Sequence, residues 1–139
     1  MSKKLVSAVP CLIILASVAS ILIAPTSLLA KNIECKFRNW KGAQNEDAAI
    51  SWIGNGFIVD EKKMRIKRIF TGKTNSEWYS AEKKKTERFT TYVFYKIDKV
   101  KGSNVKTRYG YRIYESGKCN AVLSSENYTP IMADGRTDY

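Results

Sequence analysis

The sequence predicts an all-β fold, a small antiparallel barrel or sandwich of about seven to eight strands. Three observations support this prediction. Short segments of β-branched and aromatic residues alternate with polar residues, and glycine- or asparagine-containing turns separate these segments at close spacing. Two cysteines near the ends of the mature chain, Cys35 and Cys119, indicate a disulfide that links the first and last strands.

Residues 1–30 have the features of a signal peptide that is cleaved on export. Lys3 and Lys4 precede an apolar run over residues 5–24, and Ala30 is a small residue at a suitable cleavage site. A retained membrane anchor is the alternative, because the run approaches the roughly 20 residues that span a bilayer. The prolines and serines of the segment favour cleavage. We therefore expect a single β domain of residues 31–139, secreted or periplasmic, with no stable membrane span.

The first half of the mature chain contains short apolar segments separated by turns. Residues 31–41 alternate in polarity and predict a strand on which Cys35 faces inward. A polar connection that can hold a helical turn leads to a second apolar segment at 48–53. The sequence Gly-Asn-Gly at 54–56 predicts a turn, and an extended run follows to residue 60.

Residues 64–85 are harder to assign. Residues 64–70 predict a strand, and residues 77–83 predict another. The competing interpretation is a helix over residues 76–88, because alanine, glutamate and lysine favour helix. The three lysines at 83–85 are expected to form a solvated turn.

Residues 88–124 carry the clearest sheet signal, three antiparallel strands with turns at 101–104 and 116–118. In the middle strand, apolar residues at odd positions alternate with basic residues, which predicts one buried face and one basic face. In the preceding strand we assign Tyr92 to the wet face. The last residues, 133–139, read as a polar tail.

The two mature cysteines are expected to pair, because an even number of cysteines in an exported chain usually does. Two buried free thiols are the alternative. A disulfide brings the two Cα atoms within about 7 Å. The first and last strands then lie side by side, as in a barrel, or face each other across a sandwich, and we prefer the barrel.

The charge of the mature chain is strongly positive. Without Lys3 and Lys4 it has 22 basic and 13 acidic residues, a net charge of +9. Residues 62–118 hold 17 basic and 5 acidic side chains. Such a field attracts anionic partners, among them nucleic acids, lipid head groups and acidic glycans, although it also serves solubility.

We therefore predict an exported, non-enzymatic binding protein whose basic, aromatic sheet face recognises an anionic polymer, a lipid head group or a carbohydrate-like partner. Aromatic rings between cations can stack on sugars or bases while the cations hold anionic groups. The predicted contacts are Lys67, Arg88, Lys106, Arg108 and Arg112, with Tyr92 and Tyr114 as stacking platforms.

Two other classes of function remain open. One is a barrel that carries a small ligand in an apolar interior. The residues expected to line that cavity are Trp52, Trp78, Val93 and Tyr111. The other is a hydrolase that uses paired carboxylates, for which the candidate acids are Glu46, Asp47, Asp60 and Glu61. The chain contains no histidine, so histidine-dependent catalysis is excluded, and we expect neither a metal site nor a cofactor.

Overall fold

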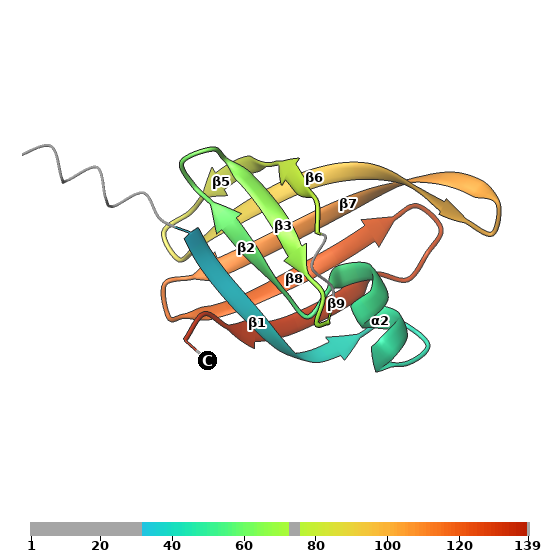
Figure 1. Ribbon diagram of the computed structural model, residues 1–139, viewed down its shortest axis with the longest axis horizontal. Coiled ribbons are helices and arrows are strands. Elements are labelled where there is room, and N and C mark those ends of the chain that lie inside the picture. The colour runs from blue at the N-terminus through green and yellow to red at the C-terminus, as the bar shows by residue number, and fades with distance from the viewer. Residues whose placement is uncertain (1–31, 73–75, 139) are drawn as a thin grey trace, which may run out of the picture. The chain divides into compact units, whose positions relative to one another are not determined.

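Nine antiparallel strands form one sheet that curls into a nearly closed barrel in the computed structural model, which describes residues 32–72 and 76–138 (Figure 1). The all-β fold class is therefore confirmed, and one short helix is added to it. The predicted signal peptide lies outside the described residues. The elements in chain order are β1 (Asn32–Lys41), α2 (Glu46–Ile53), β2 (Gly56–Asp60), β3 (Arg65–Ile69), β4 (Trp78–Ser80), β5 (Glu82–Lys85), β6 (Phe89–Val100), β7 (Ser103–Tyr114), β8 (Lys118–Ser125) and β9 (Ile131–Arg136).

One continuous segment brings the two edges of the sheet together. The strand order is β4-β3-β2-β1-β9-β8-β7-β6-β5, and only Ala81 separates β4 from β5 in the sequence. β4 pairs with β3, whereas β5 pairs with β6. The lysines at 83–85 therefore belong to a strand and not to a turn, and the helix considered over residues 76–88 is wrong.

The predicted disulfide is present and joins Cys35 of β1 to Cys119 of β8, with their Cα atoms 6.3 Å apart. Both cysteines are buried. Residues 133–139 were expected to form a polar tail, but residues as far as Arg136 belong to β9, which pairs with β1 on one side and with β8 on the other. A disulfide is the kind of cross-link that persists in oxidising compartments.

Aromatic side chains fill the centre of the barrel. The rings of Phe94 and Tyr109 stack at 4.7 Å between centroids, and those of Phe57 and Tyr111 meet at 4.8 Å. The ring of Tyr79 also stacks on that of Phe94, with 4.4 Å between the two ring centroids. Offset and tilted ring pairs add to the free energy gained from burying apolar area. The interior around Tyr111 is therefore packed with side chains.

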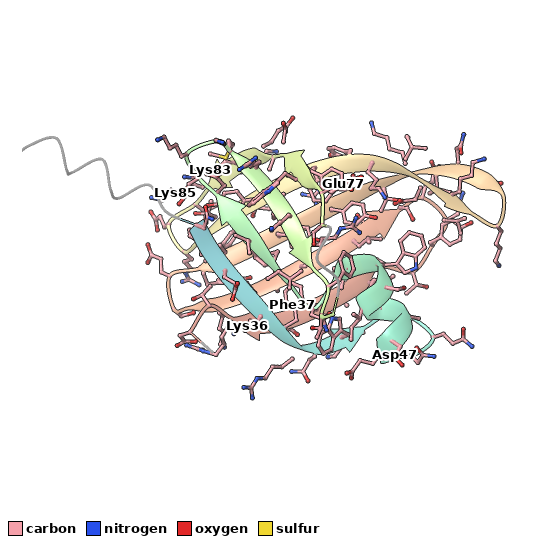
Figure 2. The ribbon with its side chains drawn as sticks, viewed as in Figure 1. Lys36, Phe37, Asp47, Glu77, Lys83 and Lys85 are labelled. Carbon is pink, nitrogen blue, oxygen red and sulfur yellow. A yellow bond between two sulfur atoms is a disulfide. The ribbon has the colours of Figure 1, made fainter. Side chains whose placement is uncertain are left out.

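The short helix α2 lies across one end of the barrel, where it contacts β1, β8 and β9 (Figure 1). Residues 48–53 were expected to form another apolar segment of the β fold, and they are helical instead. Asn45 caps the helix, because its side-chain oxygen accepts a hydrogen bond of 2.8 Å from the Ala48 amide. Lys83 and Lys85 of β5 lie toward the opposite end of the barrel from Asp47 of α2 (Figure 2). Within residues 32–72 and 76–138, no helix is long and apolar enough to cross a bilayer.

A buried carboxylate, Asp98, stands in the barrel interior near the β6–β7 turn. It is 5% exposed, pairs with Lys96 Nζ at 2.8 Å and accepts a hydrogen bond of 2.8 Å from the Tyr109 hydroxyl. Burial raises the pKa of Asp98, but the hydrogen bonds from Lys96 and Tyr109 together outweigh it and hold this pKa below its usual value. The ionised form is therefore the one that stabilises the fold.

Replacing this carboxylate by an amide, Asp98→Asn, is expected to lower the free energy of unfolding at pH 7 by about 2 kcal/mol, because it removes two charge-assisted hydrogen bonds. The contribution of Asp98 is fully present above its ordinary pKa of 3.8 and is lost as the pH falls through the lower folded-state value. Urea unfolding between pH 7 and pH 2 measures both effects. The control is Asp138→Asn at the exposed ion pair with Arg136. Equal acid sensitivity of the Asp98 variant and the native protein would contradict the assignment.

Candidate anion-binding groove

The basic face predicted for β7 lies on the outer surface of the barrel. Thr107, Tyr109 and Tyr111 are buried in the interior, whereas the intervening basic residues point outward. Because strands alternate their side chains between two faces, Lys106, Arg108 and Arg112 share this outer surface.

Three adjoining hollows follow these cations across β6 to β9, and we call them together the outer groove. The central hollow, of about 110 Å³, shares Arg108 with a hollow of about 380 Å³ near the β6–β7 turn and shares Asn120 with one of about 710 Å³ at the other end. From Lys106 to Tyr114 the strand covers roughly 26 Å, at about 3.3 Å per residue. The central hollow is lined by Thr91, Arg108, Gly110, Arg112, Asn120 and Val122. The remaining polar lining side chains are Tyr95, Lys106, Ser124, Ser125 and Glu126 at the first end and Asn39, Arg88, Tyr114, Ser116, Lys118, Asp134 and Arg136 at the second.

Arg112 is held in place by neutral groups. Its guanidinium lies 4.0 Å from the ring centre of Phe89. Its Nε donates a hydrogen bond of 3.4 Å to the Thr91 hydroxyl, and its Nη1 donates one of 3.4 Å to the Tyr114 hydroxyl. Contacts of this kind orient a guanidinium without neutralising its charge.

Tyr114 connects Arg112 to the neighbouring strand. Its hydroxyl also accepts a hydrogen bond of 3.3 Å from the side-chain amide of Asn120 on β8. The hydrogen bond from Arg112 and the weaker one from Asn120 outweigh partial burial and hold the pKa of Tyr114 below its ordinary value. This phenol therefore acts as a hydrogen-bond acceptor that positions Arg112.

Gly110 opens the floor of the central hollow. It pairs with Val93 of β6 and Val122 of β8, and it has no side chain to fill the space between Arg108 and Arg112. A Cβ atom placed at residue 110 would stand 2.7 Å from Nη1 of Arg108, so this guanidinium lies over the glycine. The hollow is therefore bordered by two arginines that are four residues apart on one strand.

Five cations of the outer groove are in none of the ion pairs formed among the described residues, whereas Arg136, which also lines the groove, pairs with Asp138. Among the described residues, the ion pairs use Lys36, Arg65, Lys83, Lys96 and Arg136. None of these pairs involves Arg88, Lys106, Arg108, Arg112 or Lys118. Glu126 and Asp134 line the two end hollows but not the central one. The positive charge of the groove is thus available to a partner.

Two of the predicted contacts lie outside the groove. Tyr92 was assigned to the wet face, but it points into the barrel and is 2% exposed, so it offers no stacking surface. Its cross-strand partner is Tyr111, which is also buried. Lys67 lies on the outer side of β3, with its Nζ 4.9 Å from the ring centre of Trp78. The other predicted contacts, Arg88, Lys106, Arg108, Arg112 and Tyr114, line the groove.

The turn between β6 and β7 explains the error at Tyr92. Only Lys101 and Gly102 lie between the paired residues Val100 and Ser103, so even-numbered residues of β6 share a face with odd-numbered residues of β7. A four-residue turn has the same consequence. This rule, applied to the sequence, places Tyr92 inside once Tyr111 is inside. No sequence pattern pointed to the groove residues Thr91, Lys118 and Asn120, because their place in the groove depends on which strands become neighbours.

The four residues expected to line an internal cavity do not meet. Tyr111 is fully buried in the aromatic core. Trp78 lies outside, with Cζ of Arg65 4.2 Å from its ring centre. Val93 is buried but points to the outer face, opposite to Tyr92, and is not part of the core cluster. Trp52 lines a hollow at the end of the barrel beside α2.

The candidate acids have other neighbours. Asp60 pairs with Arg65 at 3.0 Å, and Glu61 pairs with Lys83 at 2.6 Å. Glu46 and Asp47 are exposed in the first turn of α2, where acidic side chains favour the helix N-terminus. In the part of the chain that the structure describes, no group of three or more His, Cys, Asp or Glu side chains could hold a metal ion.

Fold and surface together define a disulfide-linked β-barrel with a basic groove on its outer face. No protein-family model, curated protein or solved structure matches this chain significantly.

Proposed function

We propose that this protein is an exported, non-enzymatic binding protein that holds an acidic glycan in the outer groove. The observation that carries the proposal is the row of five cations without ion-pair partners among the described residues. Unpaired cations along one groove attract a chain that carries sulfate, phosphate or carboxylate groups at intervals.

The state of the aromatic rings favours a glycan over a nucleic acid. The guanidinium of Arg112 lies over Phe89, and Lys106 Nζ is 4.9 Å from the ring centre of Tyr95. The Tyr114 hydroxyl is engaged by Arg112 and Asn120. Binding of single-stranded nucleic acid relies on rings that are free to stack on bases. Here Arg112 lies over Phe89 and Lys106 lies over one face of Tyr95, which is still 52% exposed, so charge and hydrogen bonding carry more of the recognition than free rings do.

An exported location is consistent with this partner. The signal-like features of residues 1–30 and the Cys35–Cys119 disulfide both support secretion or a periplasmic location. Acidic glycans are abundant at such surfaces, where a basic groove can meet them.

The proposal predicts salt-dependent binding of heparin, used as a sulfated glycan probe. The variant Arg108→Ala/Arg112→Ala is expected to bind heparin about 10- to 100-fold more weakly at low salt, because two anchored charges are lost. Its slope of log affinity against log salt should be smaller by about 1.5, since each lost contact removes roughly 0.7 to 0.9. Fluorescence titration with labelled heparin between 20 and 300 mM NaCl, roughly the range that screens surface charge, measures both quantities.

A matched control removes the same charge elsewhere. Lys62→Ala/Lys63→Ala changes two exposed lysines between β2 and β3, away from the outer groove. Neutral dextran and single-stranded oligothymidylate complete the panel. Equal losses in the two double variants, or no heparin binding at low salt, would overturn the proposal. Tighter binding of the oligonucleotide than of heparin would assign the groove to nucleic acid instead.

A further inference from the structure

Another hollow, which shares only Ser125 with the outer groove, lies between α2 and the end of the barrel. Its volume is about 390 Å³, within the roughly 300–1,000 Å³ typical of small-molecule sites. Trp52 and Ala48 of α2 form one wall, the backbone near Gly42 and Tyr128 forms another, and Leu123 and Ile131 close the barrel side. We call it the end pocket.

The chemistry of the end pocket differs from that of the rest of the surface. None of the residues that line it is charged, although charged residues make up 27% of the chain. Leu123 and Ile131 are buried at its base, and Trp52 adds an aromatic face. Buried Thr107 and its cross-strand partner Ser125 are the polar residues that β7 and β8 contribute to the pocket. A charged ligand finds no counter-ion here, whereas an uncharged apolar one loses little on leaving water.

The Trp52 wall is fixed by hydrogen bonds from three separate strands. Arg68 Nη1 donates to the Trp52 carbonyl at 2.7 Å, and the Tyr111 hydroxyl donates to the Ile53 carbonyl at 3.4 Å. Trp40 Nε1 donates to the Gly54 carbonyl at 3.0 Å. These bonds satisfy carbonyls at the end of α2 that the helix itself leaves without partners. The helix is therefore held at the barrel end and keeps the pocket open.

The opposite wall depends on a close backbone contact. Gly42 has a φ of +92°, and a Cβ atom there would overlap the Pro130 carbonyl. This contact brings the segment after β1 against the segment before β9. A site whose two walls are both built in this way is preformed, which lowers the entropic cost of binding.

We propose that the end pocket binds a small, uncharged, mainly apolar molecule that contains a ring or a short alkyl chain. The ligand lies against the face of Trp52 and reaches Leu123 and Ile131 at the base. This site is independent of the glycan proposed for the outer groove, and each can fail without the other.

The test uses N-phenyl-1-naphthylamine, an uncharged dye whose emission rises in apolar surroundings. We expect saturable binding, with energy transfer from tryptophan on excitation near 295 nm. The variant Ala48→Phe fills the pocket from α2 and should weaken binding about tenfold or more, because the added ring overpacks the site. Ser51→Phe adds the same ring at an exposed position of the same helix that does not line the pocket, and it should leave the affinity within about twofold.

Two further measurements keep the outcome decisive if Ala48→Phe folds poorly. Trp52→Phe should retain dye binding on direct excitation but lose part of the energy transfer, because Trp52 lines the pocket while Trp40, which is bonded to the Gly54 carbonyl, remains as a nearby donor. Binding of the anionic dye 8-anilinonaphthalene-1-sulfonate should become weaker in the variant Arg108→Ala/Arg112→Ala. The affinity for the uncharged dye should not change in this variant. Unsaturable dye binding, equal affinity in the two phenylalanine insertions, or unchanged energy transfer in Trp52→Phe would overturn the proposal.

Discussion

Replacing Cys35 and Cys119 together by alanine is expected to lower the free energy of unfolding by about 4 to 5 kcal/mol. The two residues are separated by 84 positions, so the cross-link removes a large amount of chain entropy from the unfolded state. A barrel of this size buries about two-thirds of its unfolded surface and has little stability in reserve. Alanine is preferred to serine, because both sites are buried and a hydroxyl there would lack a hydrogen-bond partner.

Urea unfolding followed by tryptophan fluorescence measures this loss. The native protein should lose the same stability when dithiothreitol is added after a brief denaturation, whereas the double alanine variant should not respond to the reductant. A difference in unfolding free energy below about 1 kcal/mol between the oxidised protein and the variant would contradict the expected role of the disulfide.

The second large effect is expected at Gly135 of β9. This residue pairs with Phe37 of β1 on one side and with Cys119 of β8 on the other. A Cβ atom at residue 135 would overlap the Lys36 carbonyl oxygen and stand 2.7 Å from the Phe37 Cα atom. Backbone atoms of a paired strand cannot move aside as a flexible side chain can. We therefore expect Gly135→Ala to destabilise the barrel by about 3 kcal/mol.

The matched control is Gly102→Ala in the β6–β7 turn. Gly102 has a φ of +82°, but a Cβ atom there would meet no atom within 4 Å. This variant should therefore cost only the strain of the left-handed conformation, about 1 kcal/mol. Thermal and urea unfolding of both variants separate the close approach at β9 from the general loss of a glycine. If Gly135→Ala proves no less stable than Gly102→Ala, the close packing of β1 on β9 is not a determinant of stability.

The sequence predicted the strands whose two faces differ in polarity. In β7 the basic residues at 106, 108 and 112 alternate with apolar ones, so the assignment of faces was correct. In β6 both faces carry apolar or β-branched residues. Tyr92 and Phe94 point into the barrel, whereas Thr91 and Val93 point to the outer face of the sheet, where neighbouring side chains cover them. Without a difference in polarity, only the register with β7 identifies the inner face, and Tyr92 was misassigned.

Two other elements were missed, α2 although the sequence carries a helix-start pattern, and β9 because its apolar pattern is short. The helix α2 begins at Asn45 and has Glu46 and Asp47 in its first turn, a pattern of helix starts that was legible in the sequence. In β9 only Ile131 and Ala133 are buried, too short an apolar pattern to stand out from a polar tail. The strand is held in place by hydrogen bonds with β8, which directly precedes it, and with β1, which is about 90 residues away in the chain.

By itself, the sequence determined the β class of the fold, the disulfide, and the concentration of basic residues on the middle strands, because periodicity, cysteine number and charge are properties of short segments. Only the tertiary structure decided the rest. Strand order joined the cations of β7 to Asn120 and Lys118 of β8 in one groove, and α2 formed an uncharged pocket at the barrel end. Both sites consist of residues from several strands or loops, and which of these become neighbours is set by long-range pairing rather than by any local pattern.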